Sequence, residues 1–303
     1  MTGVQTCALP ILPLLLEKAN VGELVLKRLE MQPKQKPDWT QWDIMVQKIS
    51  KERQKLRIAL VGKYVELHDA YMSVREALNH AAIYQELDLD IDWIHSSDLE
   101  KGKHFSQLEL ADGIIVPGGF GSRGIEGKIS AARFARENKV PYLGLCLGMQ
   151  LMVVEFGRYI FNDETVNSSE FDHTTPYPVI DLMPDQQHIT DLGGTMRLGL
   201  YPCKLQPNTI AKESYGVDLV EERHRHRFEF NNRYREEYQK NGMVFSGLSP
   251  DGKLVEIVEI KDHPFMLATQ FHPEFLSRPN RPHPLFIKYI QAAEQYSKTK
   301  GKL

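Results

Sequence analysis

The sequence lacks an excess of either charge and has very few cysteines. Its 37 basic and 40 acidic residues leave a net charge of -3 over 303 residues, so the composition indicates no nucleic acid or other strongly charged partner. The three cysteines, Cys7, Cys146 and Cys203, are odd in number and far apart. They exclude a disulfide framework and favour a reducing compartment, which makes the cytoplasm the default location.

A long hydrophobic run is also missing. The apolar stretch near the N-terminus, residues 8–16, is interrupted by Pro10 and Pro13 and has no basic leader. Neither a signal peptide nor a membrane-spanning helix is therefore predicted. What remains is an ordinary globular composition, 42% hydrophobic and 25% charged, which suits one or two domains.

From about residue 55 onward, short apolar segments alternate with amphipathic ones, and this alternation predicts a parallel sheet covered by helices on both faces. The expected strands are 56–61, 91–94, 113–116, 140–145, 254–260 and 265–271. The expected helices are 71–87, 128–137, 147–156 and 284–293. The segment 159–200 is expected to be rich in loops. Further helices are predicted at 12–31 and 42–54, joined by a proline-containing linker.

Cys146 has the sequence context of a nucleophile. It stands at the centre of Gly144-Leu145-Cys146-Leu147-Gly148, between an expected strand and an expected helix. Glycines on both sides allow the tight strand-to-helix turn, or nucleophile elbow, that raises a Ser or Cys side chain above a parallel sheet. The alternative is a buried, inert thiol, because free cysteines are often buried.

Two further motifs favour the nucleophile. His272-Pro273-Glu274 places a histidine and a carboxylate on one face of an extended backbone, where the carboxylate can orient and charge-stabilise the imidazole. The glycine-rich segment 117–121 follows another expected strand and can offer unobstructed N–H groups to an oxyanion. The expected donors are Gly119 and Leu147, the residue directly after the nucleophile. Together these motifs predict thiol attack on an amide.

Two nucleotide-like patterns are interpreted as structural. Residues 119–124 match G-x-G-x-x-G, but they follow an inner strand after Pro117, and the next strand runs into Cys146 instead of ending on an acidic residue. Residues 247–253 resemble a phosphate-binding loop, but Leu254 replaces the Ser or Thr that would hold magnesium, and a strand follows. A hairpin turn is expected there.

The histidine- and arginine-rich segment 221–229 is also weighed as a binding patch. Its three glutamates balance its three arginines, which argues against nucleic-acid binding. His224 and His226 have no third ligand at a convincing spacing, so no metal site is predicted.

The three catalytic motifs resemble those of the class I, triad-type glutamine amidotransferases, and further segments resemble the CTP synthase family. The general resemblance is carried by 117–121, 144–150 and 271–274, and the narrower one by 59–64, 167–171, 193–199 and 222–229. It covers residues 12–296, and 275–279 is similar to the eukaryotic-type members. Ser169 and Phe230 depart from the family pattern, where Thr and Val are usual, and neither departure removes a catalytic group.

This resemblance implies roles for individual residues. Cys146 is the nucleophile, His272 its base and Glu274 the carboxylate that orients the base. The residues expected to bind glutamine are Gly119, Leu147, Gln150, Glu170, Arg227 and Phe228, with Glu170 on its ammonium group and Arg227 and the Phe228 backbone on its carboxylate. Gly194, Thr195 and Arg197 are candidates for a lid that responds to GTP, an allosteric activator in the family. Alternatively, the glycines of that segment mark a turn.

The resemblance also implies a fold and a domain organisation. Residues 55–296 are expected to form the amidotransferase domain, an α/β fold with a flavodoxin-like, mostly parallel sheet flanked by helices. Residues 12–54 are expected to be the end of a synthetase domain and an interdomain linker, and 297–303 a polar tail. Residues 1–11 match nothing in the family and are expected to be a non-native leader.

The implied activity is hydrolysis of L-glutamine to supply ammonia for the ATP-dependent amination of UTP to CTP. ATP and magnesium would bind the synthetase domain, which is almost entirely missing here, so this chain is expected to hold no cofactor or metal and to make no CTP. The full-length enzyme is expected to be a homo-oligomer, without nucleic-acid or membrane partners. Two alternatives are a stand-alone thiol hydrolase, such as a γ-glutamyl peptidase, and a non-catalytic assembly or regulatory module.

Overall fold

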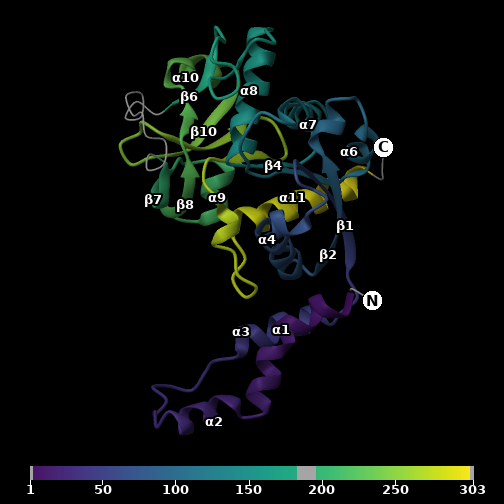
Figure 1. The fold of residues 1–303 in the computed structure, drawn as a ribbon, viewed down its shortest axis with the longest axis vertical. Coiled ribbons are helices and arrows are strands. Elements are labelled where there is room, and N and C mark those ends of the chain that lie inside the picture. The colour runs from purple at the N-terminus through teal and green to yellow at the C-terminus, as the bar shows by residue number, and fades with distance from the viewer. Residues whose placement is uncertain (1–2, 183–195, 301–303) are drawn as a thin grey trace.

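The structure, a computed structural model, describes residues 3–182 and 196–300. Its main body is built around a nine-stranded sheet (Figure 1). In spatial order the strands are β2 (Leu87–His95), β1 (Gln54–Gly62), β3 (Gly113–Val116), β4 (Tyr142–Leu145), β12 (Met266–Thr269), β11 (Val255–Ile260), β10 (Met243–Leu248), β7 (Arg197–Leu205) and β8 (Leu219–His226). A smaller sheet contains β5 (Asn167–Ser168), β6 (Pro178–Leu182) and β9 (Phe228–Phe230).

The large sheet has a parallel half and an antiparallel half. Strands β2, β1, β3, β4 and β12 are parallel, whereas each pair from β12 to β8 is antiparallel. The parallel half has the strand order 2-1-3-4-5 of flavodoxin-like folds, so the predicted fold class is confirmed. The predicted hairpin turn is also present, because β10 and β11 pair across residues 249–254.

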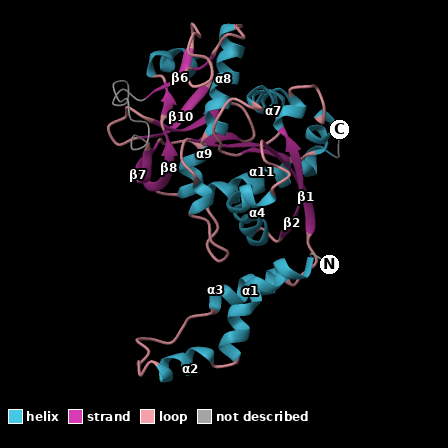
Figure 2. Cartoon of the chain, viewed as in Figure 1, coloured by secondary structure: helices cyan, strands magenta, loops and turns pink. Residues whose placement is uncertain are grey.

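Helices cover both faces of the large sheet (Figure 2). One face carries α4 (Met72–Tyr84), α9 (Ile210–Tyr215) and α11 (Pro284–Lys300). The other carries α5 (Ser96–Leu99), α6 (Phe105–Leu110), α7 (Ile125–Asn138), α8 (Leu147–Phe161) and α10 (Arg235–Lys240). In β1, Ile58 faces α4 and α11, while Ala59 and Val61 face α7 and α8. Since both faces are buried, the strand is a continuous apolar run.

Several strands were not expected from the sequence. β7, β8, β9 and β10 are absent from the predicted set, and the predicted loop-rich segment 159–200 contains the end of α8, β5, β6 and the start of β7. In β8 the buried positions are Glu222, His224 and His226, with exposed residues between them. Polar side chains on the buried face conceal the alternation by which a strand is usually recognised.

Some predicted helix boundaries are wrong. The expected helix at 71–87 starts as a 3₁₀ turn, η1 (His68–Tyr71), and α4 ends at Tyr84, because Glu86 adopts a left-handed backbone with φ 58° and the next residue starts β2. The expected helix at 42–54 ends at Ile49, and residue 54 belongs to β1. The other 3₁₀ turns are η3 (Asn232–Tyr234) and η4 (Pro273–Phe275).

The N-terminal helices extend from one end of the α/β body (Figure 1), which the last of them touches where Lys48 Nζ donates to Tyr84 O at 2.8 Å. They are α1 (Gly3–Lys18), α2 (Val21–Arg28) and α3 (Thr40–Ile49). The single helix predicted at 12–31 is therefore two helices, broken where Asn20 adopts φ 55°. α2 has no buried residue, and its Leu24 is 59% exposed. In the described part of the chain, no helix has the length and hydropathy needed to cross a bilayer.

Candidate active site

The three predicted catalytic motifs meet at one edge of the large sheet. Cys146 directly follows β4, His272 lies three residues after β12, and residues 117–121 follow β3. These strands are neighbours and parallel, so their carboxyl ends share an edge. In open α/β sheets this is the edge where ligands bind.

The predicted nucleophile elbow is present. Cys146 has φ 51° and ψ -102°, a conformation that is unfavourable for a residue with a side chain, and its N–H donates to Thr269 O at 2.7 Å. A Cβ on Gly148 would lie 2.1 Å from Val116 O, and one on Gly144 would lie 2.8 Å from the carbonyl of Gly148. Glycine is therefore required at both positions, because helix, elbow and strand approach too closely for any other residue.

His272 and Glu274 interact as predicted, although their backbone does not adopt the predicted conformation. The imidazole Nδ1 lies 2.8 Å from Glu274 Oε1. The backbone is not extended, because Pro273 starts the 3₁₀ turn η4. The His272 N–H donates to Arg223 O at 2.8 Å, and the ring stacks on Phe275 at 5.3 Å. The imidazole is thus oriented by a carboxylate, a backbone bond and an aromatic ring.

The electrostatics of the site favour a charged imidazole. Burial lowers the pKa of His272, but interactions with Cys146 and Glu274 outweigh burial and raise it to about 10. Because Nδ1 faces Glu274, Nε2 is the nitrogen left for the sulfur of Cys146. A thiol beside an imidazolium is the arrangement that cysteine hydrolases use to form a thiolate nucleophile.

Most of the predicted glutamine-binding residues line one small cavity of about 60 Å³ next to Cys146. Its lining consists of Gly119, Phe120, Cys146, Gln150, Glu170, Met196, His226, Arg227 and Phe228. Burial raises the pKa of Glu170, while the N–H of Gly121 and the charge of Arg227 act in the opposite direction. The cavity therefore carries a carboxylate and a guanidinium. Leu147, also predicted to bind glutamine, lines a neighbouring cavity instead.

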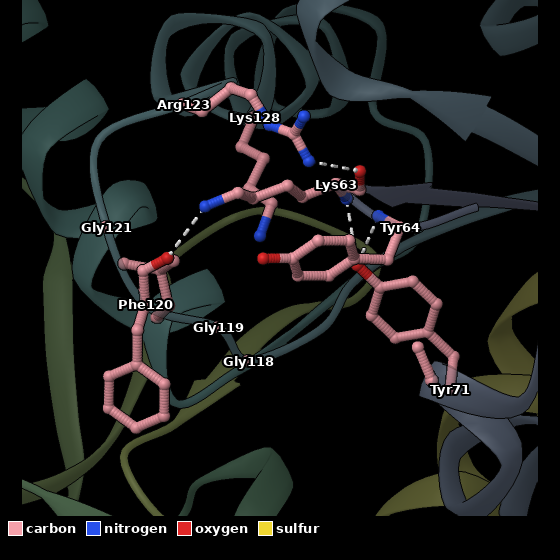
Figure 3. Close-up of a pocket in the computed structure, with 11 residues that line it drawn as sticks. Lys63, Tyr64, Tyr71, Gly118, Gly119, Phe120, Gly121, Arg123 and Lys128 are labelled. Atoms are coloured by element: carbon pink, nitrogen blue, oxygen red, sulfur yellow. Dashed lines mark hydrogen bonds between the residues drawn. The ribbon is translucent and has the colours of Figure 1, made fainter. Parts of the chain in front are cut away.

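That neighbouring cavity, of about 170 Å³, is lined in part by residues 118–121 of the glycine-rich loop (Figure 3). Lys63 Nζ donates to Phe120 O at 3.0 Å, and Arg123 Nη2 donates to Lys63 O at 3.3 Å. The hydroxyl of Tyr71 accepts the Lys63 N–H at 2.8 Å. Lys128 also lines this cavity. These contacts hold the loop from behind, and no role for Lys63, Tyr71 or Lys128 was predicted from the sequence.

A buried polar cluster next to the cavity beside Cys146 was also missed. Arg197 Nη1 lies 2.7 Å from Glu256 Oε1. His224 Nδ1 lies 2.9 Å from His226 Nε2, and His226 Nδ1 lies 3.2 Å from Phe228 O. Burial, followed by nearby positive charge, lowers the pKa of His224 to about 2 and that of His226 to about 3, so both rings are neutral. The two histidines thus act as a hydrogen-bonded support for the backbone of the cavity.

The three candidate lid residues have different outcomes. Gly194 and Thr195 lie outside the described residues. Arg197 is described, and it is a buried ion-pair residue at the start of β7. Within residues 3–182 and 196–300, no group of three or more His, Cys, Asp or Glu side chains is arranged to hold a metal ion.

Comparison with known proteins agrees with this geometry. The profile of the family "Glutamine amidotransferase class-I" matches residues 66–292. The CTP synthase of Dehalococcoides mccartyi strain CBDB1 is 58% identical over 283 residues, which cover 93% of this chain and 52% of that enzyme. The CTP synthase of Ruminiclostridium cellulolyticum is 55% identical over 288 residues, which cover 95% of this chain and 53% of that enzyme. The chain thus spans about half the length of these curated relatives.

A solved structure is also similar to this chain. The glutaminase domain of CTPS from Trypanosoma brucei, determined with bound acivicin, is 37% identical, with a TM-score of 0.75. The match covers 79% of this chain and 94% of that domain. Overall identity is higher to the bacterial enzymes than to this eukaryotic domain. The chain therefore belongs to the class I glutamine amidotransferase family and, within it, to the glutaminase domains of CTP synthases.

Proposed function

We propose that this chain hydrolyses the side-chain amide of L-glutamine, with Cys146 as the nucleophile, His272 as its acid and base, and Glu274 as the residue that orients His272. The observation that carries this proposal is the convergence of a strained elbow cysteine with a partly buried histidine whose Nδ1 is 2.8 Å from Glu274. Such an arrangement activates a thiol and keeps the imidazole in the orientation needed for proton transfer.

The reaction has two halves. The sulfur of Cys146 attacks the amide carbon, a C–S bond forms, and negative charge develops on the carbonyl oxygen. The N–H groups of Gly119 and Leu147 stabilise that oxygen, and His272 protonates the amide nitrogen, so that the C–N bond breaks and ammonia leaves. Water then loses a proton to His272 and attacks the thioester, and its cleavage gives glutamate and the free thiol.

Opposite charges in the cavity position the substrate. Glu170 binds the ammonium group of glutamine, and Arg227 with the backbone of Phe228 binds its carboxylate. Gln150 supports this wall, because its Nε2 donates to Phe228 O at 3.1 Å. Since Glu170 and Arg227 line the same cavity as Cys146, a bound glutamine would have its ends fixed on either side of the attacked amide.

The ammonia is proposed to serve the amination of UTP to CTP in a longer enzyme. The curated relatives that span twice this length are CTP synthases. The N-terminal segment exposes Leu15 in α1, Leu24 in α2 and Leu29 just after α2, each more than half exposed, as expected for a surface that packs on another domain. We assign UTP, ATP and magnesium to that synthetase domain, GTP to an activating role, and the complete enzyme to a homo-oligomer in the cytoplasm.

The direct test is ammonia release from glutamine, together with mapping of the residue labelled by a glutamine analogue that carries an electrophilic carbon. Cys146 should be labelled, and Cys146→Ala should abolish both labelling and turnover. Cys203 is the internal control, because it is buried and burial raises the pKa of its thiol well above the ordinary range. Labelling of Cys203, or ammonia release by Cys146→Ala, would refute the assignment.

The partner domain is tested separately. The 303-residue chain should form no CTP from UTP, ATP, magnesium and glutamine. Addition of a separately expressed synthetase domain should restore CTP formation and increase the response to GTP, because a ligand shifts a conformational equilibrium only through contacts that differ between its two states. CTP formation by this chain alone would contradict the assignment of CTP synthesis to the separate synthetase domain.

A further inference from the structure

A lysine with almost no exposed surface lies behind the glycine-rich loop that follows β3. Lys128, in the first turn of α7, is 2% exposed. Lysines are almost never buried to this degree without a charged partner. Across the described ranges 3–182 and 196–300, its Nζ donates one hydrogen bond, to Pro117 O at a long 3.4 Å, and pairs with no carboxylate. The fold thus maintains a positive charge that no neighbouring side chain neutralises.

The groups around Lys128 add positive charge. Lys63 and Arg123 line the same cavity (Figure 3), and no Asp or Glu belongs to its lining. Burial and then the charge of Lys63 lower the pKa of Lys128 to about 8, while Cys146 acts in the opposite direction. Glu126, on the same turn of α7, is paired with an arginine of α8 at 2.6 Å. A permanent counter-charge is therefore absent from this part of the described structure.

The negative charge that Lys128 can offset is the one that forms during the reaction. A Cβ placed on Gly119 would lie 3.6 Å from Lys128 Nζ, so the ammonium group lies close to the backbone of Gly119, one of the two proposed oxyanion donors. Fixed positive groups near developing negative charge are most effective when they are buried, because water does not screen them. This location distinguishes Lys128 from a lysine that only fills space.

We propose that Lys128 is a positioning residue for the hydrolysis of glutamine. Its ammonium group holds the Pro117 carbonyl, and with it the glycine-rich loop, in the orientation in which the Gly119 N–H faces the substrate. Its charge also stabilises the negative charge on the Cys146 sulfur and on the carbonyl oxygen under attack. This inference rests on the glutaminase function proposed above.

The role can be separated from a purely structural one through stability. Replacing an unpaired buried charge with an apolar side chain of similar size removes a desolvation penalty and tends to stabilise the fold. Lys128→Met should therefore raise the melting temperature while it lowers kcat. A lysine that only fills space would instead change stability and leave kcat unaffected.

The experiment measures kcat and KM for ammonia release, together with thermal unfolding, in the full 303-residue chain. For Lys128→Met we expect kcat to fall by about tenfold to a hundredfold, somewhat less than the loss of a direct oxyanion donor, with KM within about twofold of the parent. Lys128→Arg retains the charge and should keep more of kcat than the methionine variant. The matched control is Lys101→Met, the same change on an exposed turn, which should leave both constants unchanged.

The kinetic results for the parent and the Lys128 variants decide whether Lys128 has this role. An active parent with Lys128→Met at parental kcat would overturn the inference and leave the proposed function intact, as would a tenfold rise in KM at constant kcat. If Lys128→Arg fails to fold, the methionine variant still decides. A parent that releases no ammonia would overturn the proposed function and this inference together.

Discussion

Replacing Glu274 with Gln should lower the pKa of His272 without removing its orientation. A glutamine oxygen can still accept the hydrogen bond from Nδ1, which now spans 2.8 Å, but the negative charge is lost. A hydrogen bond to a charged group contributes about 1.5–3 kcal/mol and a neutral one about 0.5–1.5 kcal/mol, so the change is roughly 1–1.5 kcal/mol. At about 1.36 kcal/mol per unit, the pKa should fall by about one unit, from about 10.

The measurement is a pH titration of the His272 imidazole by nitrogen-15 NMR, with the resonance assigned from its loss in His272→Gln. The alkaline limb of kcat/KM for ammonia release should move to lower pH in parallel. Glu274→Ala, which also removes the acceptor, should in addition lower kcat at every pH. A midpoint in Glu274→Gln that equals or exceeds the parental value would refute the electrostatic role of Glu274.

The raised pKa of His272 also makes stability depend on pH. The folded-state pKa of about 10 lies above the unfolded value of about 6.5, so the protonated ring favours the native state. This contribution is fully present below about pH 6.5 and is lost as pH rises through about 10. Urea unfolding should therefore show a larger gap between the parent and His272→Gln near about pH 6 than near about pH 10.5, and a gap that widens with pH would contradict the sign.

Three further substitutions test other parts of the site. Arg227→Met should raise KM for glutamine by about tenfold to a hundredfold, with a smaller effect on kcat, because a charge-assisted contact of roughly 1.5–3 kcal/mol is lost. Gly148→Ala should lower the free energy of unfolding by roughly 1–3 kcal/mol and reduce kcat, because its Cβ would lie 2.1 Å from Val116 O and push α8 away from β3. Arg197→Met should lower the free energy of unfolding by about 3–5 kcal/mol, because it leaves Glu256 buried without its partner.

Matched controls exist on α2. Gly22→Ala introduces a Cβ with no atom within 4 Å, and Arg28→Met makes the arginine-to-methionine change on an exposed surface. Both should leave stability and kinetics close to the parent. Equal effects of Gly148→Ala and Gly22→Ala would show that the elbow is not sterically constrained. An unchanged KM in Arg227→Met would contradict the assignment of the substrate carboxylate.

The parts of the site that could be predicted from the sequence depend on short-range geometry. The elbow follows from glycines two residues on either side of Cys146, and the parallel half follows from apolar runs separated by amphipathic helices. The pairing of His272 with Glu274 was predicted correctly from an incorrect backbone, because Pro273 starts a turn that still brings the two side chains to 2.8 Å. The two-residue spacing of His272 and Glu274 therefore determined that their side chains meet, but not the backbone conformation between them.

What could not be predicted depends on contacts distant in sequence. Lys128 lies behind the loop that joins β3 to α7, in a cavity that Lys63 and Tyr71 from another part of the chain also line, and nothing in the neighbouring residues distinguishes it from an exposed lysine. The strand β8 was missed because its inward side chains include Glu222 and His224, which are partnered by residues far along the chain. Arg197 was expected on a mobile lid and is buried for the same reason, since its partner Glu256 lies on β11.

The register of two central strands sets the distance on which the chemistry depends. Leu145 pairs with Thr269, and the nucleophile and its base follow these partners on β4 and β12. A slip of one residue would displace His272 by about 3.3 Å along the strand, beyond reach of the sulfur. Both strands are internal and paired on each side, so local fraying cannot separate the catalytic pair. Loss of the enhanced reactivity of Cys146 during denaturation should therefore report cooperative unfolding of the whole domain. The rate at which an alkylating reagent specific for Cys146 ceases to react would then measure the rate of unfolding.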